Sequence, residues 1–344
     1  MYEAINLQIG DEVLCPVYTF HATVSPMMYL GAVPVFCDSD SSGNISLEQI
    51  KARRTTKTKA VIVTHMWGMP VKDIQAIADY CKSESLYLLE DCSHAHGARI
   101  DGKPVGSFGD ISAWSLQGQK IITGGEGGIL LTDNKSLYNR ALLHGHYNKR
   151  PKEEIKEHEP LREFYLTGFG LKLRAHPIAI AIADDQFDQL DSFLAVKRYN
   201  ASKLNKALSG YPFLRTPELS DNYEPSWYAY GLQFFDSKAH GVSKQDFVNA
   251  LHAEGLVEVD VPGSTGLLNT TPLFIHPEKV LDRLYDGPLD EQKDFPIAKG
   301  FYDSFIKIPV WSYEDESDII DLYIRGIKKV SDHISRHGSL HPEV

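Results

Sequence analysis

The first 135 residues alternate between two hydrophobic periods, and this alternation limits the possible folds more than any other feature of the sequence. Short runs of apolar and β-branched residues predict buried strands at residues 12–15, 33–37, 59–64, 86–90, 111–115 and 128–132. Segments with helical spacing separate several of these runs, at residues 21–30 and 72–82. Because this order implies parallel pairing with helices on both faces, we expect an α/β fold whose ligands bind at the carboxyl ends of the strands.

The second half of the chain lacks this rhythm. A helical pattern begins at residue 177 and continues to residue 208, and strand and helix signals return at residues 227–235, 244–254 and 318–335. At roughly 150 residues per domain, a chain of 344 residues fits two domains. We therefore predict a large α/β domain over residues 1–200, which has a mostly parallel central sheet flanked by helices and includes the linking helix. A smaller α+β domain is predicted over residues 201–344.

A strongly charged segment lies between these regions. Residues 149–163 read KRPKEEIKEHEPLRE, in which ten of fifteen residues are charged and two are proline. Such a composition is typical of a solvated loop, and the alternative is a mobile flap beside a binding site. Both interpretations stay open at this point.

Charge and cysteine usage exclude several classes of function. The formal net charge of −11 repels phosphate backbones, so we predict no nucleic-acid partner. The four cysteines include no CxxC pair, which argues against a disulfide framework or a thiolate zinc site and for a reducing compartment. The first residues lack a basic and then apolar signal region, and no apolar run reaches 18 residues. We therefore predict a cytoplasmic protein with no membrane partner.

Reactive side chains follow the predicted strand at residues 86–90. This strand leads into Glu90 and Asp91, and the sequence continues CSHAHG. A carboxylate at the end of a buried strand needs a partner, and three kinds are open. One is the protonated ring nitrogen of a cofactor. Another is a metal ion held by Asp91, His94 and His96, and a third is a helix N-terminus or a nearby arginine.

A lysine follows the next predicted strand. Ser115 ends that strand, and Lys120 lies five residues later, shortly before four glycines in five positions. Glycines let the backbone approach a ligand closely, a lysine in a desolvated pocket can form a Schiff base, and Ser115 could hold a phosphate. A single lysine is more often a solvated surface amine. The sequence has no GxGxxG after the first strand, no GxxxxGK[ST] and no GxSxG, so dinucleotide, nucleoside triphosphate and esterase interpretations lack their motifs.

Several motifs occur together in a characteristic order. They are GDEVLCPVYTFHAT (10–23), GAVPVFCD (31–38), EDCSHAHGA (90–98), VGSFGD (105–110), SLQGQKIITGGEGG (115–128), GLKLRAHPIAIAIADDQ (170–186), SWYAYGLQF (226–234) and IPVW (308–311). In these motifs the chain resembles the DegT/DnrJ/StrS family of sugar and aminocyclitol aminotransferases, which depend on pyridoxal phosphate (PLP). The resemblance covers nearly the whole chain and implies the aspartate-aminotransferase fold, fold type I.

The resemblance implies a role for each matching residue. Lys120 would form the Schiff base with the cofactor and carry protons, and Asp91 would pair with the pyridinium nitrogen. His94 would lie near the ring oxygen, Phe20 would stack on the ring, and Ser115 would bind the phosphate. A dehydrating relative has histidine at the lysine position, so Lys120 favours amino transfer.

The resemblance also implies a homodimer with shared active sites. Lys172 stands where a common family pattern has an asparagine that reaches the cofactor phosphate from the partner subunit, and a lysine can bind phosphate as a point charge. Arg174 would be offered across the same interface. No metal site is predicted for such an enzyme.

The implied reaction moves an amino group from glutamate or glutamine to a keto-sugar, often nucleotide-linked, or to a keto-cyclitol. The Gln-Gly-Gln before Lys120 is similar to members that aminate cyclitols in antibiotic pathways. Family members usually carry an upstream Ser-Gly-Thr segment that holds the phosphate, and its apparent lack here leaves open a non-catalytic or regulatory homologue. A metal-dependent hydrolase that uses Asp91, His94 and His96, with His144 or His146, is the remaining alternative.

Overall fold

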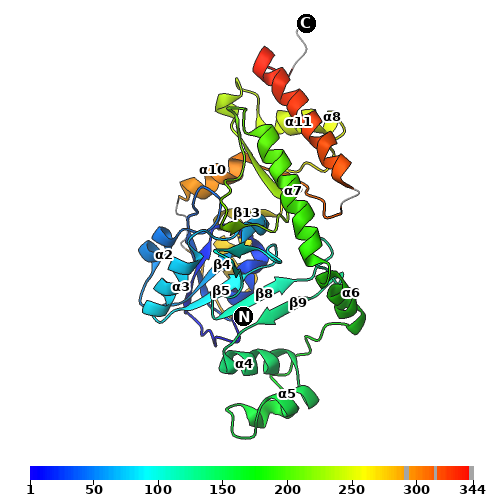
Figure 1. Cartoon of the computed structure of the whole chain (residues 1–344). Coiled ribbons are helices and arrows are strands. Elements are labelled where there is room, and N and C mark those ends of the chain that lie inside the picture. The colour runs from blue at the N-terminus through cyan, green and yellow to red at the C-terminus, as the bar shows by residue number, and fades with distance from the viewer. Residues whose placement is uncertain (290–293, 314–315, 341–344) are drawn as a thin grey trace.

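A six-stranded sheet forms the centre of the first half of the chain (Figure 1). The structure is a computed structural model, and it describes residues 1–289, 294–313 and 316–340. The strand order is β3 (Val33–Cys37), β1 (Glu12–Pro16), β4 (Thr58–Thr64), β5 (Tyr87–Asp91), β8 (Ile111–Ser115) and β9 (Gly128–Leu131). All neighbours pair in parallel except β8 and β9. The six predicted strands and the mostly parallel sheet are confirmed, and each strand begins and ends within one residue of its prediction.

Both faces of this sheet are buried because successive residues of each strand point to opposite sides. Val13 packs with α1 (Ser25–Met28) and with Leu137 of α4 (Lys135–Gly145) in one core. Leu14 packs on the other face with Ile50 of α2 (Leu47–Arg53) and Ile74 of α3 (Ile74–Ser83). The strands therefore read as continuous apolar runs, which explains why the sequence predicted them well.

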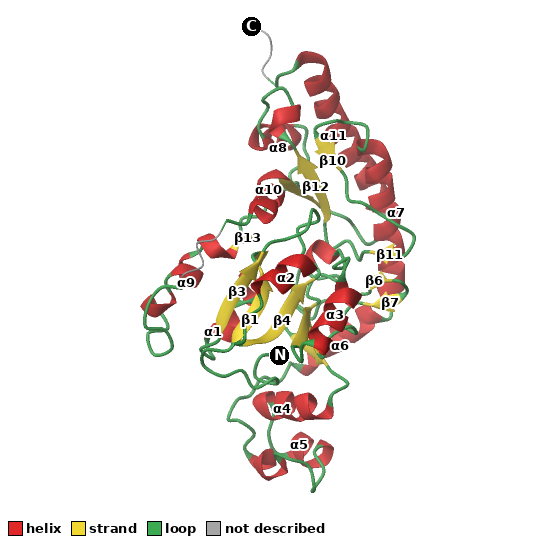
Figure 2. Cartoon of the chain, turned by 90° about the vertical axis from the view of Figure 1, so that its left-hand side faces the viewer, coloured by secondary structure: helices red, strands yellow, loops and turns green. Residues whose placement is uncertain are grey.

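A three-stranded antiparallel sheet forms the second half of the chain. Its order is β10 (Leu214–Arg215), β12 (Tyr230–Phe234) and β14 (Phe305–Ile308). Its core includes residues of α7 (Leu190–Leu208), α8 (Lys244–Ala253) and α11 (Ser317–His337), and Figure 2 shows β10 and β12 beside these helices. Since α7 runs across residue 200, the helix itself connects the two sheets. The division into domains 1–200 and 201–344 stays a prediction.

The predicted linking helix is in fact two helices. α6 (Pro177–Phe187) ends before Asp188, and α7 begins at Leu190. Because of the break, the two helices contact different parts of the chain. Gln186 of α6 accepts a hydrogen bond from the Thr123 amide at 2.9 Å, whereas Leu194 of α7 packs with Ile121 and Phe193.

The charged segment at residues 149–163 is not the predicted loop throughout. It contains α5 (Lys149–Glu154), and Arg150 pairs with Glu154 at 2.7 Å. Ile155 is fully buried against Leu142 and Leu143 of α4. Leu161 packs against the same cluster. These apolar contacts, which the charge count conceals, hold the segment on α4.

The remaining elements are short. They are β2 (Tyr18–Phe20), β6 (Arg99–Ile100), β7 (Lys103–Pro104), β11 (Tyr223–Glu224), β13 (Thr265–Leu267), α9 (Pro272–Ile275), α10 (Pro296–Ser304), η1 (His21–Thr23), η2 (Met66–Gly68), η3 (Arg162–Leu166), η4 (Asp236–Lys238), η5 (Leu268–Thr270) and η6 (Pro277–Lys279). The antiparallel pair β2 and β13 ties residues 265–267 to the first half of the chain. Over the described ranges, no helix combines the length and the apolar character needed to cross a bilayer.

Candidate active site

A cavity of about 700 Å³ opens where the central parallel strands end. Thr64 of β4, Asp91 of β5 and Ser115 of β8 contribute to its lining, as does Lys120 in the loop after β8. Residues from the second sheet complete the wall, among them Lys307 of β14. The cavity therefore lies at the edge of the sheet where the topology places a ligand.

Hydrogen bonds from three donors hold the Asp91 carboxylate. The Thr23 hydroxyl donates to Oδ2 at 2.7 Å, and the Ser93 amide and hydroxyl donate to Oδ1 at 3.0 and 2.5 Å. Among the described residues, no lysine or arginine nitrogen lies within 4.0 Å of this carboxylate. Asp91 is thus oriented by neutral groups while it faces the cavity.

The loop that carries Lys120 is packed against α6. The Lys120 amide donates to the Gln117 carbonyl at 2.9 Å. A Cβ atom on Gly124 would lie 2.5 Å from the Ala179 carbonyl oxygen, so a glycine is needed for the loop to approach the helix this closely. The glycine run noted in the sequence therefore serves, at Gly124, to seat the lysine loop.

Burial and two neighbouring charges shift the pKa of Lys120. Its Nζ is 4.8 Å from the centre of the Tyr228 ring, and the side chain is half-buried. Burial lowers the pKa of Lys120, the Asp91 carboxylate opposes this effect, and the positive charge of Lys307 adds to it. A lysine with a lowered pKa more readily provides the free amine that attacks a carbonyl carbon.

His94 forms an aromatic stack beside the lysine. Its ring lies 4.0 Å from the Tyr228 ring at an interplanar angle of 3°, and 5.5 Å from the Trp67 ring. The Trp67 amide donates to Nδ1 at 3.4 Å, which places the ring proton on Nε2. Burial, with a contribution from Lys120, holds the pKa of His94 well below its ordinary value. The imidazole is therefore neutral at physiological pH.

Gly68 allows three segments of the site to meet. Its φ is +83°, and an added Cβ atom would lie 2.5 Å from the Ser226 hydroxyl oxygen and 2.8 Å from the Tyr228 nitrogen. The same atom would lie 2.9 Å from the His94 carbonyl oxygen. A side chain at this position would thus push Tyr228 and His94 apart.

The cavity brings together five of the six residues predicted to bind the cofactor. They are Lys120, Asp91, His94, Ser115 and Phe20. Phe20 is 39% exposed and its ring lies 4.4 Å from that of His21. The Ser115 hydroxyl accepts a hydrogen bond from the Gln117 amide at 3.2 Å. The individual roles of these five residues stay predictions.

Lys172 is not among the residues that line the cavity of its own chain. It is exposed, and its Nζ lies 5.5 Å from the centre of the Tyr147 ring. The Arg174 guanidinium lies 5.4 Å from the same ring. Because both were predicted to act on a partner subunit, their place outside this cavity leaves that prediction untested.

The lining residues to which sequence reasoning gave no role include Thr23, Trp67, Tyr228 and Lys307. Thr23 and Tyr228 lie inside quoted motifs without having been assigned a role, and Lys307 directly precedes the IPVW motif. Their side chains matter only through contacts with residues distant in sequence, so spacing gave no signal for them.

The predicted metal ligands do not converge. Over the described residues, one group of three metal-ligating atoms lies within 4.8 Å of one another, and it consists of His65, Glu90 and Cys92 rather than Asp91, His94 and His96. In that group His65 Nδ1 accepts from the Val71 amide at 3.0 Å, and Nε2 lies 3.1 Å from Glu90. Since both of its ring nitrogens are engaged, His65 offers no ligand atom. Asp91, His94 and His96 do not form such a group within the described ranges, so the structure gives the hydrolase alternative no metal site.

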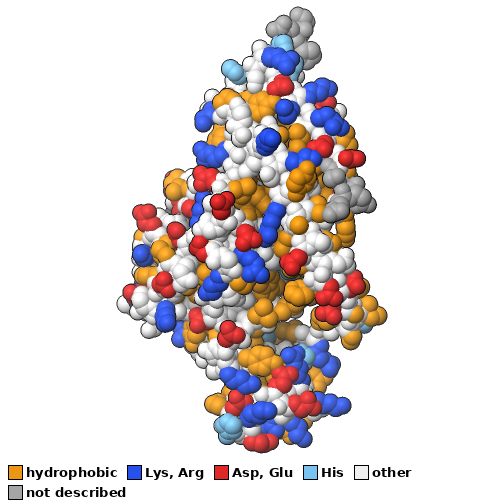
Figure 3. Space-filling model, viewed as in Figure 1, with side chains coloured by type: hydrophobic (Ala, Val, Ile, Leu, Met, Phe, Trp, Pro, Cys, Tyr) orange, Lys and Arg blue, Asp and Glu red, His pale blue; other side chains and the backbone are white. Residues whose placement is uncertain are grey.

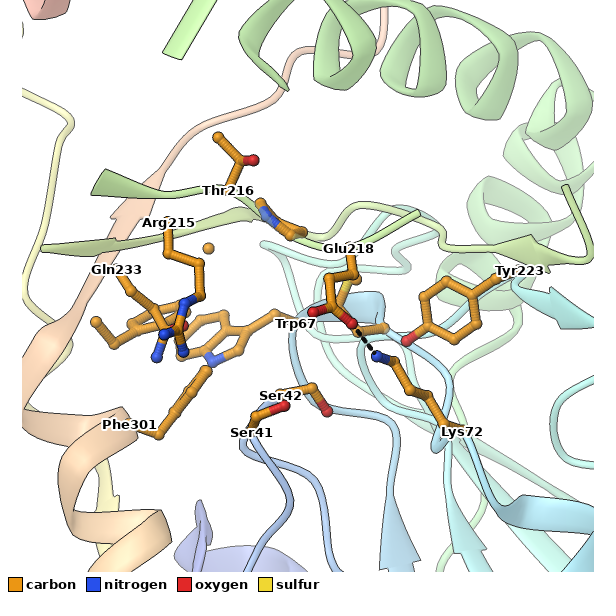
Figure 4. Close-up of a pocket in the computed structure, with 14 residues that line it drawn as sticks. Ser41, Ser42, Trp67, Lys72, Arg215, Thr216, Glu218, Tyr223, Gln233 and Phe301 are labelled. Carbon is orange, nitrogen blue, oxygen red and sulfur yellow. Dashed lines mark hydrogen bonds and ion pairs between the residues drawn. The ribbon is translucent and has the colours of Figure 1, made fainter. Parts of the chain in front are cut away.

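A second, smaller cavity of about 70 Å³ shares Trp67 with the first (Figure 4). Lys72 and Glu218 form an ion pair of 2.8 Å in it, and Arg215 lies near Gln233. Neither Lys120 nor Asp91 lines it. It is smaller than the 300 Å³ or more that is typical of sites for organic ligands, so we assign the chemistry to the larger cavity.

Comparisons with known proteins agree with this geometry. The model of the DegT/DnrJ/EryC1/StrS aminotransferase family matches residues 1–322. GDP-perosamine synthase of Escherichia coli O157:H7 is 37% identical over 207 residues, which are 60% of this chain and 54% of that protein. L-glutamine:scyllo-inosose aminotransferase of Streptomyces griseus is 29% identical, over 96% of this chain and 79% of that protein. The solved structure of an aminotransferase from Psychrobacter cryohalolentis is 26% identical, covers 97% of this chain and 84% of its own, and superimposes with a TM-score of 0.81.

Proposed function

The chain belongs to the DegT/DnrJ/EryC1/StrS aminotransferase family, and from that premise we propose that it transfers the amino group of glutamate or glutamine to a keto-sugar or keto-cyclitol. The donor's amino group is exchanged for the acceptor's carbonyl oxygen, so the donor leaves as a 2-oxo acid and the acceptor as an amine. The observation that carries this proposal is Lys120, with its lowered pKa, in one cavity with Asp91. This cavity favours the catalytic interpretation over a non-catalytic homologue.

The described residues fit pyridoxal phosphate, the cofactor of this family. When bound, pyridoxal phosphate supplies an aldehyde that condenses with amines and a ring that takes up electron density. No lysine or arginine nitrogen of the described residues lies within 4.0 Å of the Asp91 carboxylate, so it can accept a hydrogen bond from a protonated ring nitrogen. Phe20 would stack on the ring, His94 would lie near the ring oxygen, and the Ser115 hydroxyl would donate to the phosphate.

Lys120 would do two tasks in sequence. Its unprotonated Nζ, which the lowered pKa favours, would hold the cofactor through the aldehyde. The same Nζ would accept the proton from the donor α-carbon and return a proton to the acceptor carbon. His94 is neutral and adds no further positive charge beside Lys120.

We further propose that the active protein is a homodimer. Hydrophobic side chains are exposed at several places on the face seen in Figure 3. On α6 and just before it, Leu173, Ile178, Ile182 and Phe187 are 46–65% exposed. Helix α6 carries no charged residue in its first seven positions. An apolar surface of this kind indicates a protein interface, and the adjacent Lys172 and Arg174 would then reach the partner's cofactor. In a symmetric dimer, the partner subunit would contribute the same residues to the interface.

The relatives indicate the chemical class of the acceptor and not its identity or its pathway. GDP-perosamine synthase supports a nucleotide-linked sugar, and L-glutamine:scyllo-inosose aminotransferase supports a cyclitol. The four cysteines carry thiols rather than disulfides, which supports action in the reducing cytoplasm.

The first experiment is an absorption spectrum of the purified protein during titration with pyridoxal phosphate. Borohydride reduction and peptide mass mapping would follow. We expect a bound-cofactor band, label on Lys120, and loss of the band when glutamate or glutamine is added. Lys120→Ala should lack the band and all turnover, while Lys299→Gln, a surface lysine paired with Asp303, should match the wild type. A label on any other lysine would refute the assignment.

Sedimentation velocity tests the dimer. Ile182→Asp should shift the protein to monomers and reduce turnover, because the substitution places a charge in the apolar surface. Leu322→Asp changes an equally exposed leucine on α11 and should leave the dimer intact. A wild-type protein that sediments as a monomer at micromolar concentration would contradict this part of the proposal.

A further inference from the structure

Lys307 lines the cavity from β14 of the second sheet. It lies on β14 between Ile306 and Ile308, which are fully buried in the core of the second sheet. Because side chains alternate along a strand, Lys307 points away from that core and lines the cavity. Backbone hydrogen bonds with Asp260 at 2.8 and 3.0 Å, and pairing with Gly231 of β12, fix the strand at this residue.

The Lys307 ammonium has no ion-pair partner in the part of the chain that the structure describes. No carboxylate oxygen of those residues lies within 4.0 Å of its Nζ. The side chain is half-buried, and its charge lowers the pKa of both Lys120 and His94. A second positive charge beside Lys120 weakens the site electrostatically unless an anion compensates it. The carboxylates of Asp91 and Asp260 also line the cavity. Because neither lies within ion-pair distance of Lys307 Nζ, the Lys307 ammonium is available to an anionic group of a ligand.

The arrangement of the walls indicates which anion this is. Asp91, Ser115 and Phe20, which suit the cofactor, come from the first half of the chain, whereas Lys307 comes from the second sheet. The donor must bring its amino group to the place of Lys120 Nζ, and its α-carboxylate is attached to the same carbon as that amino group. A compact ammonium near Lys120 on the substrate side is well placed for such a carboxylate.

We propose that Lys307 binds a carboxylate of the amino-acid donor and so determines the preference for amino acids over simple amines. This inference rests on the proposed function. Among the ligands, Lys307 contacts the donor only, so its removal weakens donor binding and leaves the affinities for pyridoxal phosphate and for the acceptor unchanged.

The test compares the wild type with Lys307→Gln, Lys307→Arg and the surface control Lys299→Gln. Stopped-flow absorbance follows the loss of the bound-cofactor band as a function of L-glutamate and L-glutamine concentration, and of n-propylamine, which lacks a carboxylate. In Lys307→Gln the Kd for the amino acids should rise roughly 10- to 100-fold, while reactivity with n-propylamine stays within about twofold. Lys307→Arg should recover part of the amino-acid affinity, and Lys299→Gln should match the wild type.

The other outcomes overturn the inference in distinguishable ways. If Lys307→Gln loses affinity for pyridoxal phosphate and keeps its donor Kd, the lysine holds the cofactor phosphate. If it instead loses affinity for GDP or dTDP, measured by calorimetry on the holoenzyme, the lysine serves a nucleotide-linked acceptor. If both Lys307 variants keep the wild-type donor Kd and a normal cofactor band, this inference is wrong and the proposed function is unaffected. Absence of the band in the wild type removes the proposed function and this inference with it.

Discussion

Replacing Glu90 by glutamine should destabilise the protein far more than the removal of one charge suggests. Glu90 is fully buried. One carboxylate oxygen accepts from the Phe108 and Gly109 amides at 2.8 and 2.6 Å, and the other accepts from the Gly106 amide at 2.7 Å and from His65 Nε2 at 3.1 Å. A glutamine in the same place has one oxygen and one NH₂ group, so it can serve only one of these two pairs of donors.

The imidazole cannot adapt to the substitution, because His65 Nδ1 already accepts from the Val71 amide. Two buried donors are therefore left without an acceptor, at about 1–3 kcal/mol each, or roughly 2–6 kcal/mol in total. With an unfolding entropy of about 2.1 cal/mol/K per residue, this lowers Tm by roughly 3–8 °C. Glu84→Gln, which breaks only the surface ion pair with Arg54, should cost less than about 1 kcal/mol.

Differential scanning calorimetry at several pH values is the assay. Burial raises the pKa of Glu90, but hydrogen bonds from His65 and from the backbone amides of Gly109 and Gly106 outweigh it, and the pKa is lowered overall. The stabilisation is thus present above the unfolded pKa of about 4.3 and is lost as the pH falls through the lower folded value. The difference in Tm between wild type and Glu90→Gln should narrow in acid. A shift below about 1 °C at pH 7 would refute the hydrogen-bond argument.

Three further perturbations test other parts of the structure. Gly68→Ala should lower the free energy of unfolding by about 1–3 kcal/mol and weaken cofactor binding in a titration, because its Cβ would collide with Ser226 and Tyr228. Gly102→Ala is the control for backbone strain alone, since Gly102 has a φ of +73° and open space around it. Equal cofactor affinity in the two variants would contradict the packing argument. Lys197 donates to the carbonyls of Trp227 and Val310, and burial lowers its pKa to about 8. Since the unfolded chain holds this proton up to about pH 10.4, the stability of the wild type relative to Lys197→Met should rise by roughly 3 kcal/mol between pH 8 and 10.5 in urea titrations, and a flat difference would show that the lysine is not buried. Asp91→Asn should reduce kcat roughly 10²- to 10³-fold while the circular dichroism spectrum stays unchanged, and wild-type turnover would remove Asp91 from the mechanism.

The sequence predicted the central sheet accurately for a physical reason. A parallel sheet covered on both faces buries consecutive residues such as Val13 and Leu14, so each strand appears as an uninterrupted apolar run. The lysine loop and the acidic strand end were found for a similar reason, since both are local in sequence. The break between α6 and α7 was not predicted in this way, because the apolar spacing continues across it and the contacts of the two helices, such as that of Gln186 with the Thr123 amide, join distant segments.

Glu90 and Asp91 show how far local pattern can lead. The sequence indicated that carboxylates at this strand end need partners, but it could not separate the two residues. Adjacent residues on a strand face opposite ways, so Asp91 reaches the cavity while Glu90 turns to His65 and to backbone amides of residues 106–109. Backbone donors leave no mark in a sequence. The structure was therefore needed to show which of the two carboxylates is held by structural partners and which one faces the cavity.

Lys307 illustrates the opposite limit. In the run Phe305–Ile308 a single lysine interrupts three buried apolar residues, a pattern that the sequence shared with any edge strand that turns one charge to solvent. The difference is what lies beyond the strand, namely the end of the parallel sheet with Asp91 and Lys120. On an ordinary edge strand, solvent would hydrate the Lys307 ammonium. Here the ammonium lies near the amine of Lys120, and it has no carboxylate partner among the described residues. Selectivity for the donor can thus reside in a strand of the second sheet, while the cofactor is held by the first.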